Sequence, residues 1–461
     1  MRPVDKIKRG VASWGARTAA AVLLLGACST DTLLLAPDPD LVTPETVTNA
    51  EGANAVYIGA LARFRNITGG AESAWLFGGL LADEWSTSST FIQNDETDQR
   101  QIQLNNSSVT GMFRDLARVR TASNQAIAGL AQYQPTRVAE RAEMYFARGF
   151  AELQLASDFC NGIPLSDAAG TSLVYGTPKT GAEVFNVAIA SFDSARALVS
   201  GLTDAASVRV ERAARIGKAR AQIGLGNAAA AATTINTGAA IPGTYSYDHT
   251  FAPSSGDNTL WAQPFSAARY IVGDSLEGNV PPSYTVANAI PFSRANDPRV
   301  PTTILTTLGQ DGQTRIRRTT LWGRSTSIPV VNGLDAALIR AEAALEAGNI
   351  AGMKTILDSL RASPRTQGAI TTPVMAALPL PADQAAAVSL YFREKAFWTF
   401  SRGQRLGDLR RMIREYGRTA ANTFPTGTHF KGPAYGSDVN LPVPTDEQNN
   451  PNFTGCIDRN P

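Results

Sequence analysis

Apolar residues recur every three or four positions along much of this chain, which is the spacing of one face of an amphipathic helix. The spacing predicts helices over residues 53–64, 111–133, 137–159 and 180–199. The third of these segments runs into Asn-Gly-Ile-Pro at 161–164, a sequence that ends a helix. Long Ala-rich stretches support the assignment, because alanine has the highest helix propensity. The chain is therefore expected to be mainly α-helical.

Two pairs of shorter helices are predicted around Gly-Asn dipeptides. The first pair covers residues 208–225 and 228–235, and the second covers 335–347 and 350–362. Small residues stand where the helices of each pair would cross, and Gly supplies the left-handed turn conformation. This order resembles tetratricopeptide packing, although Ala-rich helical hairpins also occur elsewhere.

Two segments lack helical periodicity. Residues 72–108 are rich in Ser, Thr, Asn and Gln, and they predict a short helix followed by a long exposed loop. Residues 241–333 are dominated by Pro, Gly, Ser and Thr, with scattered aromatic residues and short strand-like pieces such as 314–322. A compact domain rarely keeps long irregular segments without a use for them. We therefore expect 241–333 to be an irregular subdomain between helical parts at 48–240 and 334–461.

The first 27 residues have the organisation of a secretory signal. Basic residues come first, an apolar run follows at 19–25, and small residues precede Cys28. Seven apolar residues are far too few to span a bilayer core, which needs about 20. A frayed terminal helix or a short membrane anchor is the alternative interpretation.

The sequence Leu-Gly-Ala-Cys at 25–28 resembles the bacterial lipobox. This resemblance implies cleavage before Cys28 and lipidation of its thiol and of the new amino group, and several acyl chains give stable anchoring. Residues 28–47, with prolines at 37, 39 and 44, would then form an extended tether. We expect the protein at the outer membrane, facing the cell surface.

Charge excludes one class of partner. The chain has 42 Lys and Arg against 40 Asp and Glu, but residues 1–27 hold five of the basic residues and one of the acidic ones. The remainder therefore carries 37 basic against 39 acidic residues, a net charge of −2. No clustered basic face of the kind that binds nucleic acid is evident.

The other two cysteines, Cys160 and Cys456, form an even pair in a chain expected in an oxidising compartment. We predict a disulfide that joins the helical middle of the chain to the C-terminal tail. Two free, buried thiols are the alternative, because sequence does not give the distance between the Cα atoms.

Motifs of common enzymes and metal sites are missing from the sequence. The two histidines, His249 and His429, have no zinc-ligand spacing, and neither a Gly-x-Ser-x-Gly elbow nor a phosphate loop is present. Asp95 and Asp98 could contact calcium, but a solvated acidic loop is the favoured interpretation. No cofactor and no catalytic activity are expected.

Aromatic residues in the loop-rich parts are the candidates for ligand contact. Flat rings can stack on the apolar C–H faces of sugars while polar neighbours bond the hydroxyls. Each ring is individually more often a core residue, so one to three of the set are expected to line a site. The candidates are Trp75, Trp85, Trp261, Tyr270, Tyr284 and Trp322.

The segment 391–411 reads YFREKAFWTFSRGQRLGDLRR. It resembles the late helical motif of the SusD/RagB nutrient-binding lipoproteins, where an arginine-glutamate pair begins a helix and Gly-x-Arg-x-x-Asp-Leu-x-Arg follows. Arg402 replaces the acidic residue that usually precedes the glycine. The matching positions are Arg393, Glu394, Phe400, Gly403, Arg405, Asp408, Leu409 and Arg411.

Three further features follow the same order as in that family. The ending LPVPTDE at 441–447 with Asn-Pro at 450–451 resembles the family's C-terminal motif, and the helix at 137–159 followed by Ile-Pro-Leu resembles an early one. The lipobox also fits. The resemblance therefore covers nearly the whole chain.

The resemblance implies a fold and a function. The fold would be a SusD-like α-superhelical scaffold of tetratricopeptide-like helix pairs, with a loop-rich face that carries the ligand site. The protein would be the lid of a SusC/RagA-type TonB-dependent outer-membrane barrel and would capture oligosaccharides or peptides without catalysis. An envelope scaffold lipoprotein built on the same helix pairs is the alternative.

The motif's carboxylates allow one further hypothesis. Glu394 and Asp408 are 14 positions apart, or roughly 21 Å on a continuous helix. That separation exceeds the spacing of glycosidase carboxylates, unless Gly403 and Gly407 break the helix. We favour a structural cluster of ion pairs over a catalytic site.

Overall fold

The computed structural model describes residues 47–70, 73–169, 172–278, 284–432 and 434–461. The proposed signal, Cys28 and nearly all of the tether lie outside these ranges. The part that begins at Val47 forms one compact unit. Its longer helices are α3 (Ala50–Gly69), α4 (Ala74–Leu81), α5 (Ile92–Asp98), α6 (Ser107–Tyr133), α7 (Val138–Asp158), α8 (Gly181–Leu198), α9 (Ala205–Gly224), α10 (Ala228–Asn236), α12 (Gly333–Glu346), α13 (Ile350–Arg361), α14 (Gln384–Trp398) and α15 (Arg405–Glu415). The mainly α-helical fold predicted from the sequence is thus confirmed.

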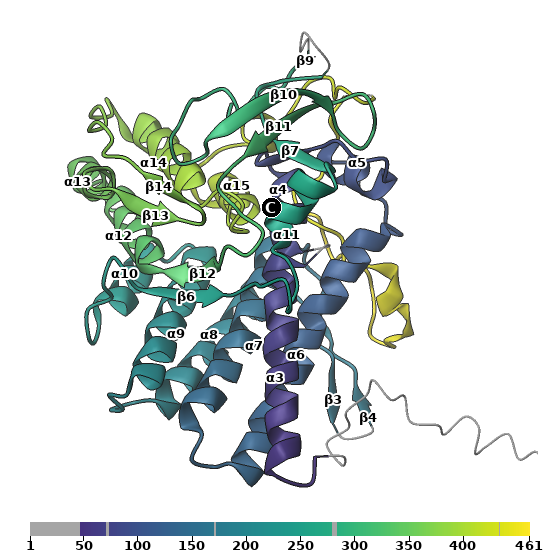
Figure 1. Cartoon of the computed structure of the whole chain (residues 1–461), viewed down its shortest axis with the longest axis vertical. Coiled ribbons are helices and arrows are strands. Elements are labelled where there is room, and N and C mark those ends of the chain that lie inside the picture. Colours follow the sequence, from purple (N-terminus) through teal and green to yellow (C-terminus); the bar gives the residue numbers. More distant parts are fainter. Residues whose placement is uncertain (1–46, 71–72, 170–171, 279–283, 433) are drawn as a thin grey trace, which may run out of the picture. The chain divides into compact units, whose positions relative to one another are not determined.

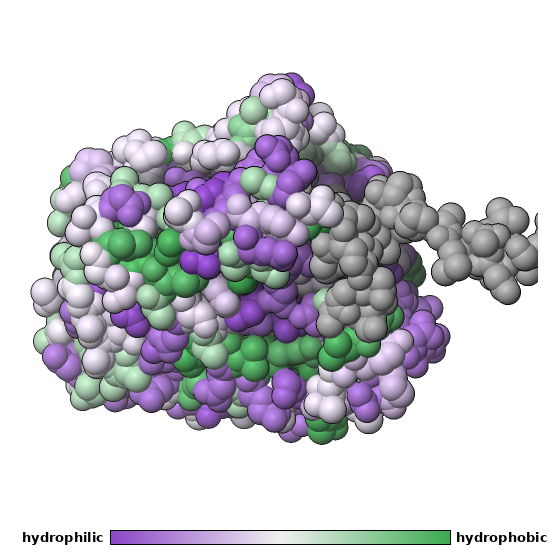
Figure 2. Space-filling model, turned by 90° about the horizontal axis from the view of Figure 1, so that it is seen from below, coloured by the Kyte–Doolittle hydropathy of each residue, from purple (hydrophilic) through white to green (hydrophobic). Residues whose placement is uncertain are grey.

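Long helices that are consecutive in the chain pack side by side. In Figure 1, α3 and α6 to α9 run nearly parallel to one another in the lower half, with most of the strands above them and β3 and β4 beside their lower ends. The connections between α6 and α7 and between α8 and α9 are short, which makes neighbouring helices antiparallel. Figure 2 shows the face seen from below, where hydrophilic residues surround separate apolar areas.

The two Gly-Asn dipeptides form the turns that the sequence predicts. Gly226 and Gly348 have φ of 71° and 69°, the left-handed conformation that glycine adopts without strain. The following asparagines cap the second helix of each pair. The Asn227 side chain accepts a hydrogen bond from the Ala230 N–H of α10, and the Asn349 side chain accepts one from the Gly352 N–H of α13. One residue therefore reverses the chain and the next one starts the new helix.

The strands form short two-stranded antiparallel ribbons in the described residues. The paired strands are β1 (Trp85–Thr87) with β7 (Tyr270–Val272), β2 (Ile163–Pro164) with β5 (Pro178–Lys179), β3 (Asp167–Ala169) with β4 (Ser172–Val174), β6 (Ser246–His249) with β12 (Ile328–Asn332), β8 (Leu276–Glu277) with β9 (Tyr284–Thr285), β10 (Thr302–Leu308) with β11 (Arg315–Thr319), and β13 (Arg365–Gln367) with β14 (Ile370–Thr372). Several ribbons lie within 241–333, together with the short helices α11 (Thr259–Trp261) and η2 (Ala262–Ser266).

An aromatic cluster fixes the β6–β12 ribbon to the helices. The ring of Tyr247 on β6 lies 4.8 Å from that of Phe146 on α7, and Phe64 on α3 lies 5.8 Å from Phe146. All three side chains are buried. Edge-to-face contacts of this kind stabilise a core beyond the area that they bury.

The prediction of a long exposed loop after the first short helix of residues 72–108 is wrong. Residues 84–89 are buried, and the segment contains both β1 and α5. Asp98 accepts a hydrogen bond of 2.7 Å from the backbone N–H of Thr87, and Asp95 accepts one of 2.7 Å from its hydroxyl. Asp95 and Asp98 are thus structural acceptors rather than a solvated acidic loop. The polar side chains pair with one another, and β1 pairs with the distant strand β7, a partner that local sequence does not reveal.

The predicted disulfide is present. Cys160, directly after α7, is bonded to Cys456 in the tail, with a Cα–Cα distance of 5.7 Å. The alternative of two free thiols is therefore excluded in this structure. None of the described helices is both long and apolar enough to cross a membrane.

Candidate functional site

A groove of about 920 Å³ lies between the β6–β12 ribbon, the loop at 321–327 and the β13–β14 hairpin. The connection between α14 and α15 closes its floor with Phe400 and Arg402. The aromatic side chains of its wall are Tyr245 and Trp322. Ligand sites in proteins commonly have this composition, an apolar wall with a few placed polar groups.

The polar groups of the groove come from three different elements. Asp248 lies on β6, Thr326 and Ser327 lie on the loop, and Arg365 and Gln367 lie on β13. The Arg365 Nε donates to the Leu360 carbonyl oxygen at 3.0 Å, and its Nη groups bond no other described residue. Burial lowers the pKa of Arg365, but a guanidinium remains charged at neutral pH. The groove therefore offers a fixed cation with free donors.

Trp322 is buried in the wall rather than displayed as a platform. Gly368 turns the β13–β14 hairpin with φ of 54°, and a Cβ there would meet the Trp322 ring at 2.9 Å. The hairpin thus covers one part of the ring, which is 4% exposed.

A second aromatic surface lies beside the same loop. The rings of Trp261 on α11 and Phe265 on η2 stack at 5.1 Å with an interplanar angle of 20°. The guanidinium of Arg318 lies 4.0 Å from the Phe265 ring centroid, and Phe265 is 45% exposed. The cation–π contact holds the ring in place while part of it stays exposed to solvent.

The loop at 321–327 connects the groove to this stacked pair. Asn258 is the N-cap of α11, and its backbone N–H donates to the Arg324 carbonyl oxygen at 2.9 Å. Its side-chain amide donates to the Thr326 carbonyl oxygen at 3.0 Å. Arg324 also forms an ion pair of 2.9 Å with Asp257. The groove and the stacked pair are thus built on one fixed loop.

The six aromatic candidates from the sequence separate into two groups. Trp75, Trp85 and Tyr270 are at most 2% exposed and belong to the core, so they cannot contact a ligand in this structure. They were expected in loop-rich parts of the chain, but they lie on α4, β1 and β7 and pack into the core. Trp322 and Trp261 lie at the groove and at the stacked pair, and Tyr284 is 37% exposed on β9.

Sequence reasoning missed several residues of the groove and its surroundings. Tyr245, Asp248, Arg365 and Gln367 come from segments without a motif, and only the folded hairpins bring them together. Phe265 could have been identified, because it follows Trp261 by four positions, the spacing of one helical face.

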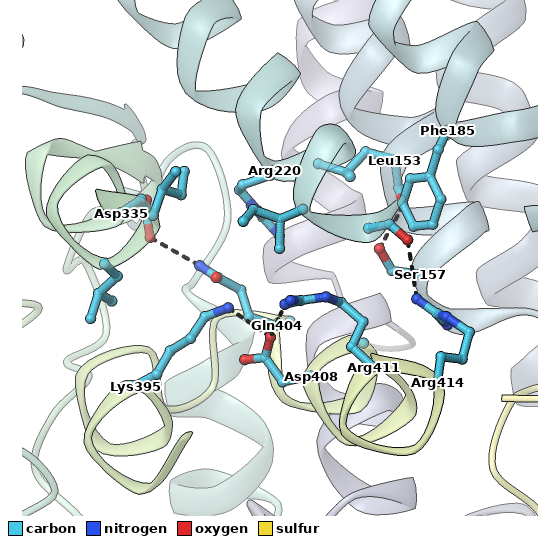
Figure 3. A pocket seen from close by; sticks show the side chains of 16 residues that line it. Leu153, Ser157, Phe185, Arg220, Asp335, Lys395, Gln404, Asp408, Arg411 and Arg414 are labelled. Carbon is cyan, nitrogen blue, oxygen red and sulfur yellow. Dashed lines mark hydrogen bonds and ion pairs between the residues drawn. The ribbon is translucent and has the colours of Figure 1, made fainter. Parts of the chain in front are cut away.

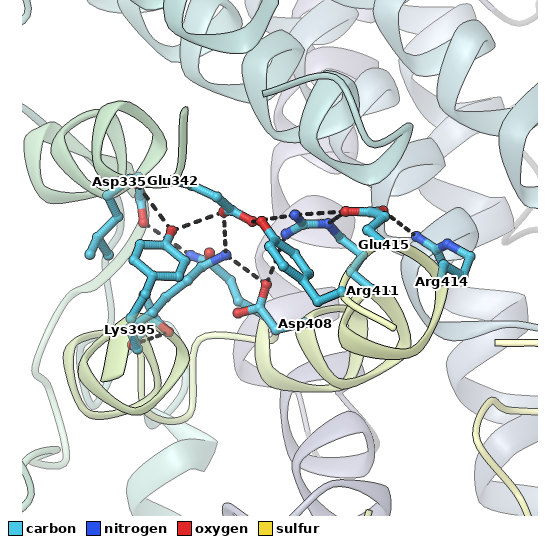
Figure 4. A network of polar contacts seen from close by, with 12 residues as sticks. Asp335, Glu342, Lys395, Asp408, Arg411, Arg414 and Glu415 are labelled. Atoms are coloured by element: carbon cyan, nitrogen blue, oxygen red, sulfur yellow. Dashed lines mark hydrogen bonds and ion pairs between the residues drawn. The ribbon is translucent and has the colours of Figure 1, made fainter. Parts of the chain in front are cut away.

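Several motif residues take part in buried ion pairs, and Figure 4 shows the network around Asp408 and Arg411. The helix does break between Glu394 on α14 and Asp408 on α15. Glu394 pairs with Arg299 at 2.7 Å and with Arg361 at 3.0 Å, whereas Asp408 pairs with Lys395 at 2.6 Å. The two carboxylates therefore serve different clusters.

Glu342 on α12 lies at the centre of this network. Burial alone would raise its pKa, but Arg411 and Lys395 outweigh that effect and lower the pKa to about 2. The hydroxyl of Tyr391 also donates to it, at 2.9 Å. Arg393 is exposed and lies over the Phe397 ring at 4.9 Å, so it stands outside the network.

A metal site has no support in the described residues. They contain no group of three or more His, Cys, Asp or Glu side chains that could hold an ion. Asp95, one of the two carboxylates considered for calcium, forms an ion pair of 3.1 Å with Lys431.

Solved structures share this arrangement of helices and ribbons. No family model and no curated protein matches the sequence. A SusD superfamily protein from Bacteroides vulgatus superposes with a TM-score of 0.62 at 14% identity, covering 89% of this chain and 99% of that one. A laminarin-binding SusD-like protein gives 0.59 at 16%, covering 89% and 99%. Surface glycan-binding protein A from Bacteroides uniformis gives 0.59 at 12%, covering 88% and 99%.

The fold and the groove define a helical scaffold with a loop-built depression on one side. This chain has the SusD-like fold, and the resemblance stated from its motifs is confirmed at that level. Sequence identities of 11–16% establish a shared fold but do not identify the ligand of this chain.

Proposed function

We propose that this protein binds glycans without transforming them, using the groove and the neighbouring Trp261–Phe265 pair. The observation that carries the proposal is the groove itself, where aromatic rings, polar groups from three elements and the free donors of Arg365 converge on a SusD-like scaffold. Sugars present apolar faces to rings and hydroxyl oxygens to donors. Arg365 would donate to the ligand, and the exposed part of the Phe265 ring would contact it.

The relatives support this choice of ligand class. One of them is named for laminarin binding and another for glycan binding at the surface. A binding protein also fits the motif carboxylates, which are engaged in ion pairs in this structure.

We further propose that the protein is lipid-anchored through Cys28 and acts as the lid of a TonB-dependent outer-membrane transporter. The signal-like N-terminus, the lipobox and the SusD-like fold support this role. The lid would capture a ligand in the groove and pass it to the barrel.

Titration with glycans tests the binding site. The protein, purified in mild detergent, is titrated by calorimetry with soluble polysaccharides, laminarin first. We expect binding that Phe265→Ala and Arg365→Ala each weaken about tenfold, a loss of about 1.4 kcal/mol. Tyr175→Ala is the matched control, because Tyr175 is 40% exposed beside the β3–β4 hairpin and outside the groove. Equal loss in the control, or no loss in either variant, would refute this site.

Co-purification tests the transporter partnership. The lipoprotein is recovered from gently solubilised outer membranes, and the proteins that accompany it are identified by mass spectrometry. A stoichiometric β-barrel transporter is the expected result. Recovery with periplasmic assembly factors and no barrel would instead favour the scaffold function.

A further inference from the structure

A small cavity lies between the long helices and the C-terminal helices, and it shares no lining residue with the groove (Figure 3). Its volume is about 50 Å³, and α7, α8, α9, α12, α14 and α15 all contribute to its wall. A water molecule occupies about 30 Å³. The space therefore holds one atomic ion or one or two waters and excludes larger solutes.

Arg220 on α9 faces this cavity without an acceptor. Figure 3 shows its side chain among the residues that line the space. Its guanidinium lies 5.4 Å from the Phe150 ring centroid but forms no hydrogen bond or ion pair with any residue that the structure describes. Its Nη1 is shut off from solvent. Burial lowers the pKa of Arg220, as expected for a cation without a partner.

The other charged groups around the cavity already balance. Asp335 pairs with Arg402 at 2.7 Å, and Asp408 pairs with Lys395 at 2.6 Å. Two more carboxylates and two guanidinium groups form one chain of ion pairs: Arg411 pairs with both Glu342 and Glu415, and Glu415 also pairs with Arg414. Four cations thus face four anions, and Arg220 is the unpaired fifth cation.

Asp158 is the next carboxylate, and it does not resolve the imbalance. It accepts a hydrogen bond of 2.7 Å from Gln154, and the charges of the buried Arg410 and of Arg220 act on it without an ion pair to either. Burial raises the pKa of Asp158 to about 7, so its negative charge is only partial at neutral pH. It is not among the residues that line the cavity.

The uncapped start of α15 faces the same space. Gln404 is the N-cap, but its side chain donates to Asp335 at 3.0 Å instead of accepting from the helix. The first helical hydrogen bond runs from the Asp408 N–H to the Gln404 carbonyl oxygen. The N–H groups of residues 405–407 therefore precede it and have no acceptor in the described part of the chain. Gly403, Gln404 and Gly407 all line the cavity.

We propose that this cavity binds one halide-sized monovalent anion between the Arg220 guanidinium and the N-terminal amides of α15. Helix N-termini attract anions through their free N–H groups and the helix dipole. The unpaired guanidinium adds a full positive charge opposite them. The anion neutralises the fifth cation and links α9 to α15, so its function is to hold the long helices against the C-terminal helices.

Bromide diffraction tests occupancy directly. Crystals of the protein grown in sodium bromide are measured at the bromine absorption edge. We expect an anomalous difference peak in the cavity, next to the Arg220 guanidinium. Ordered water at that place without anomalous signal would overturn the proposal.

Thermal unfolding tests whether the ion belongs to the fold. The melting temperature is compared in sodium chloride and in sodium methanesulfonate at equal ionic strength, since methanesulfonate is too large for the cavity. A ligand that binds only the folded chain raises the melting temperature, here by about 1–3 °C in chloride. Equal values in the two salts, even with a bromide peak, would mean an adventitious ion only and would overturn the proposal.

Two variants separate this site from general salt effects. Arg220→Gln should abolish the difference between the salts, whereas Arg324→Gln should preserve it, because Arg324 forms an exposed ion pair on another surface. If Arg220→Gln does not fold, the diffraction and salt results on the unaltered protein decide the matter alone.

Discussion

Arg405 holds the carboxylate of Asp83 with two hydrogen bonds across 322 positions of sequence. The Nε–Oδ1 distance is 2.6 Å and the Nη2–Oδ2 distance is 2.8 Å. Both side chains are at most 5% exposed. The pair fixes the start of α15 to the turn after α4, and this bidentate geometry requires a guanidinium.

Arg405→Lys should destabilise the protein strongly. A lysine keeps the positive charge but cannot make both bonds, and the loss of one buried hydrogen bond to a charged group costs about 1.5–3 kcal/mol. The free energy of unfolding from urea titration measures the loss. Arg393→Lys is the control, because that motif arginine is exposed and forms no ion pair in the described residues. A loss below about 1 kcal/mol in Arg405→Lys would contradict this view of the pair.

Gly403→Ala should be among the most damaging single substitutions in the motif. Gly403 has φ of 63°, and a Cβ there would lie 2.1 Å from Cδ1 of the buried Trp75 ring. Both backbone strain and overpacking oppose the change, so we expect a loss of about 3 kcal/mol or more.

A second glycine separates these two causes. Gly417 has φ of 66°, but a Cβ there meets no atom within 4 Å. Gly417→Ala should therefore cost only the backbone term, about 1–2 kcal/mol. Equal losses in the two variants would show that contact with Trp75 is unimportant.

Glu84→Gln should change the dependence of stability on pH. Burial raises the pKa of Glu84 to about 8, whereas an unfolded glutamate has a pKa of about 4.3. The folded chain thus holds the proton more tightly. This contribution to stability is complete below pH 4 and is lost as the pH rises towards 8.

The variant removes this titration and keeps the shape of the side chain. We expect equal stability near pH 4 and an advantage for Glu84→Gln of roughly 1–4 kcal/mol at pH 8.5. Urea titrations at the two pH values measure it, with Glu51→Gln on the exposed first turn of α3 as control. A variant that is less stable than the unaltered protein at pH 8.5 would contradict the raised pKa.

Loss of the disulfide should release the C-terminal tail. The tail is also held by a hydrogen bond of 2.8 Å from the Ile457 N–H to the Asn161 carbonyl oxygen. Replacing Cys160 and Cys456 by alanine should cost about 2–5 kcal/mol. Hydrogen exchange should accelerate first in residues 440–461, while α7 stays protected. Thiols that react in denaturant without reductant would show that the bond does not form.

The sequence by itself determined the scaffold. Apolar spacing placed the long helices, as the agreement over α6, α7 and α8 shows, because a 3.6-residue period is a local property of the chain. Gly226 and Gly348 were readable as turns for the same reason, since the left-handed conformation is a property of the residue itself. The two cysteines were few enough to be paired by counting.

The tertiary structure alone decided burial and site. Trp85 is followed by polar sequence but is buried, because β1 pairs with β7, and Trp75 is buried because α15 covers α4. Asp83 and Arg405 have no relation in the sequence until the helices pack. Likewise Tyr245, Trp322 and Arg365 meet only when three ribbons and loops converge. Such contacts depend on which surfaces remain exposed after the core has formed, and no local pattern encodes that.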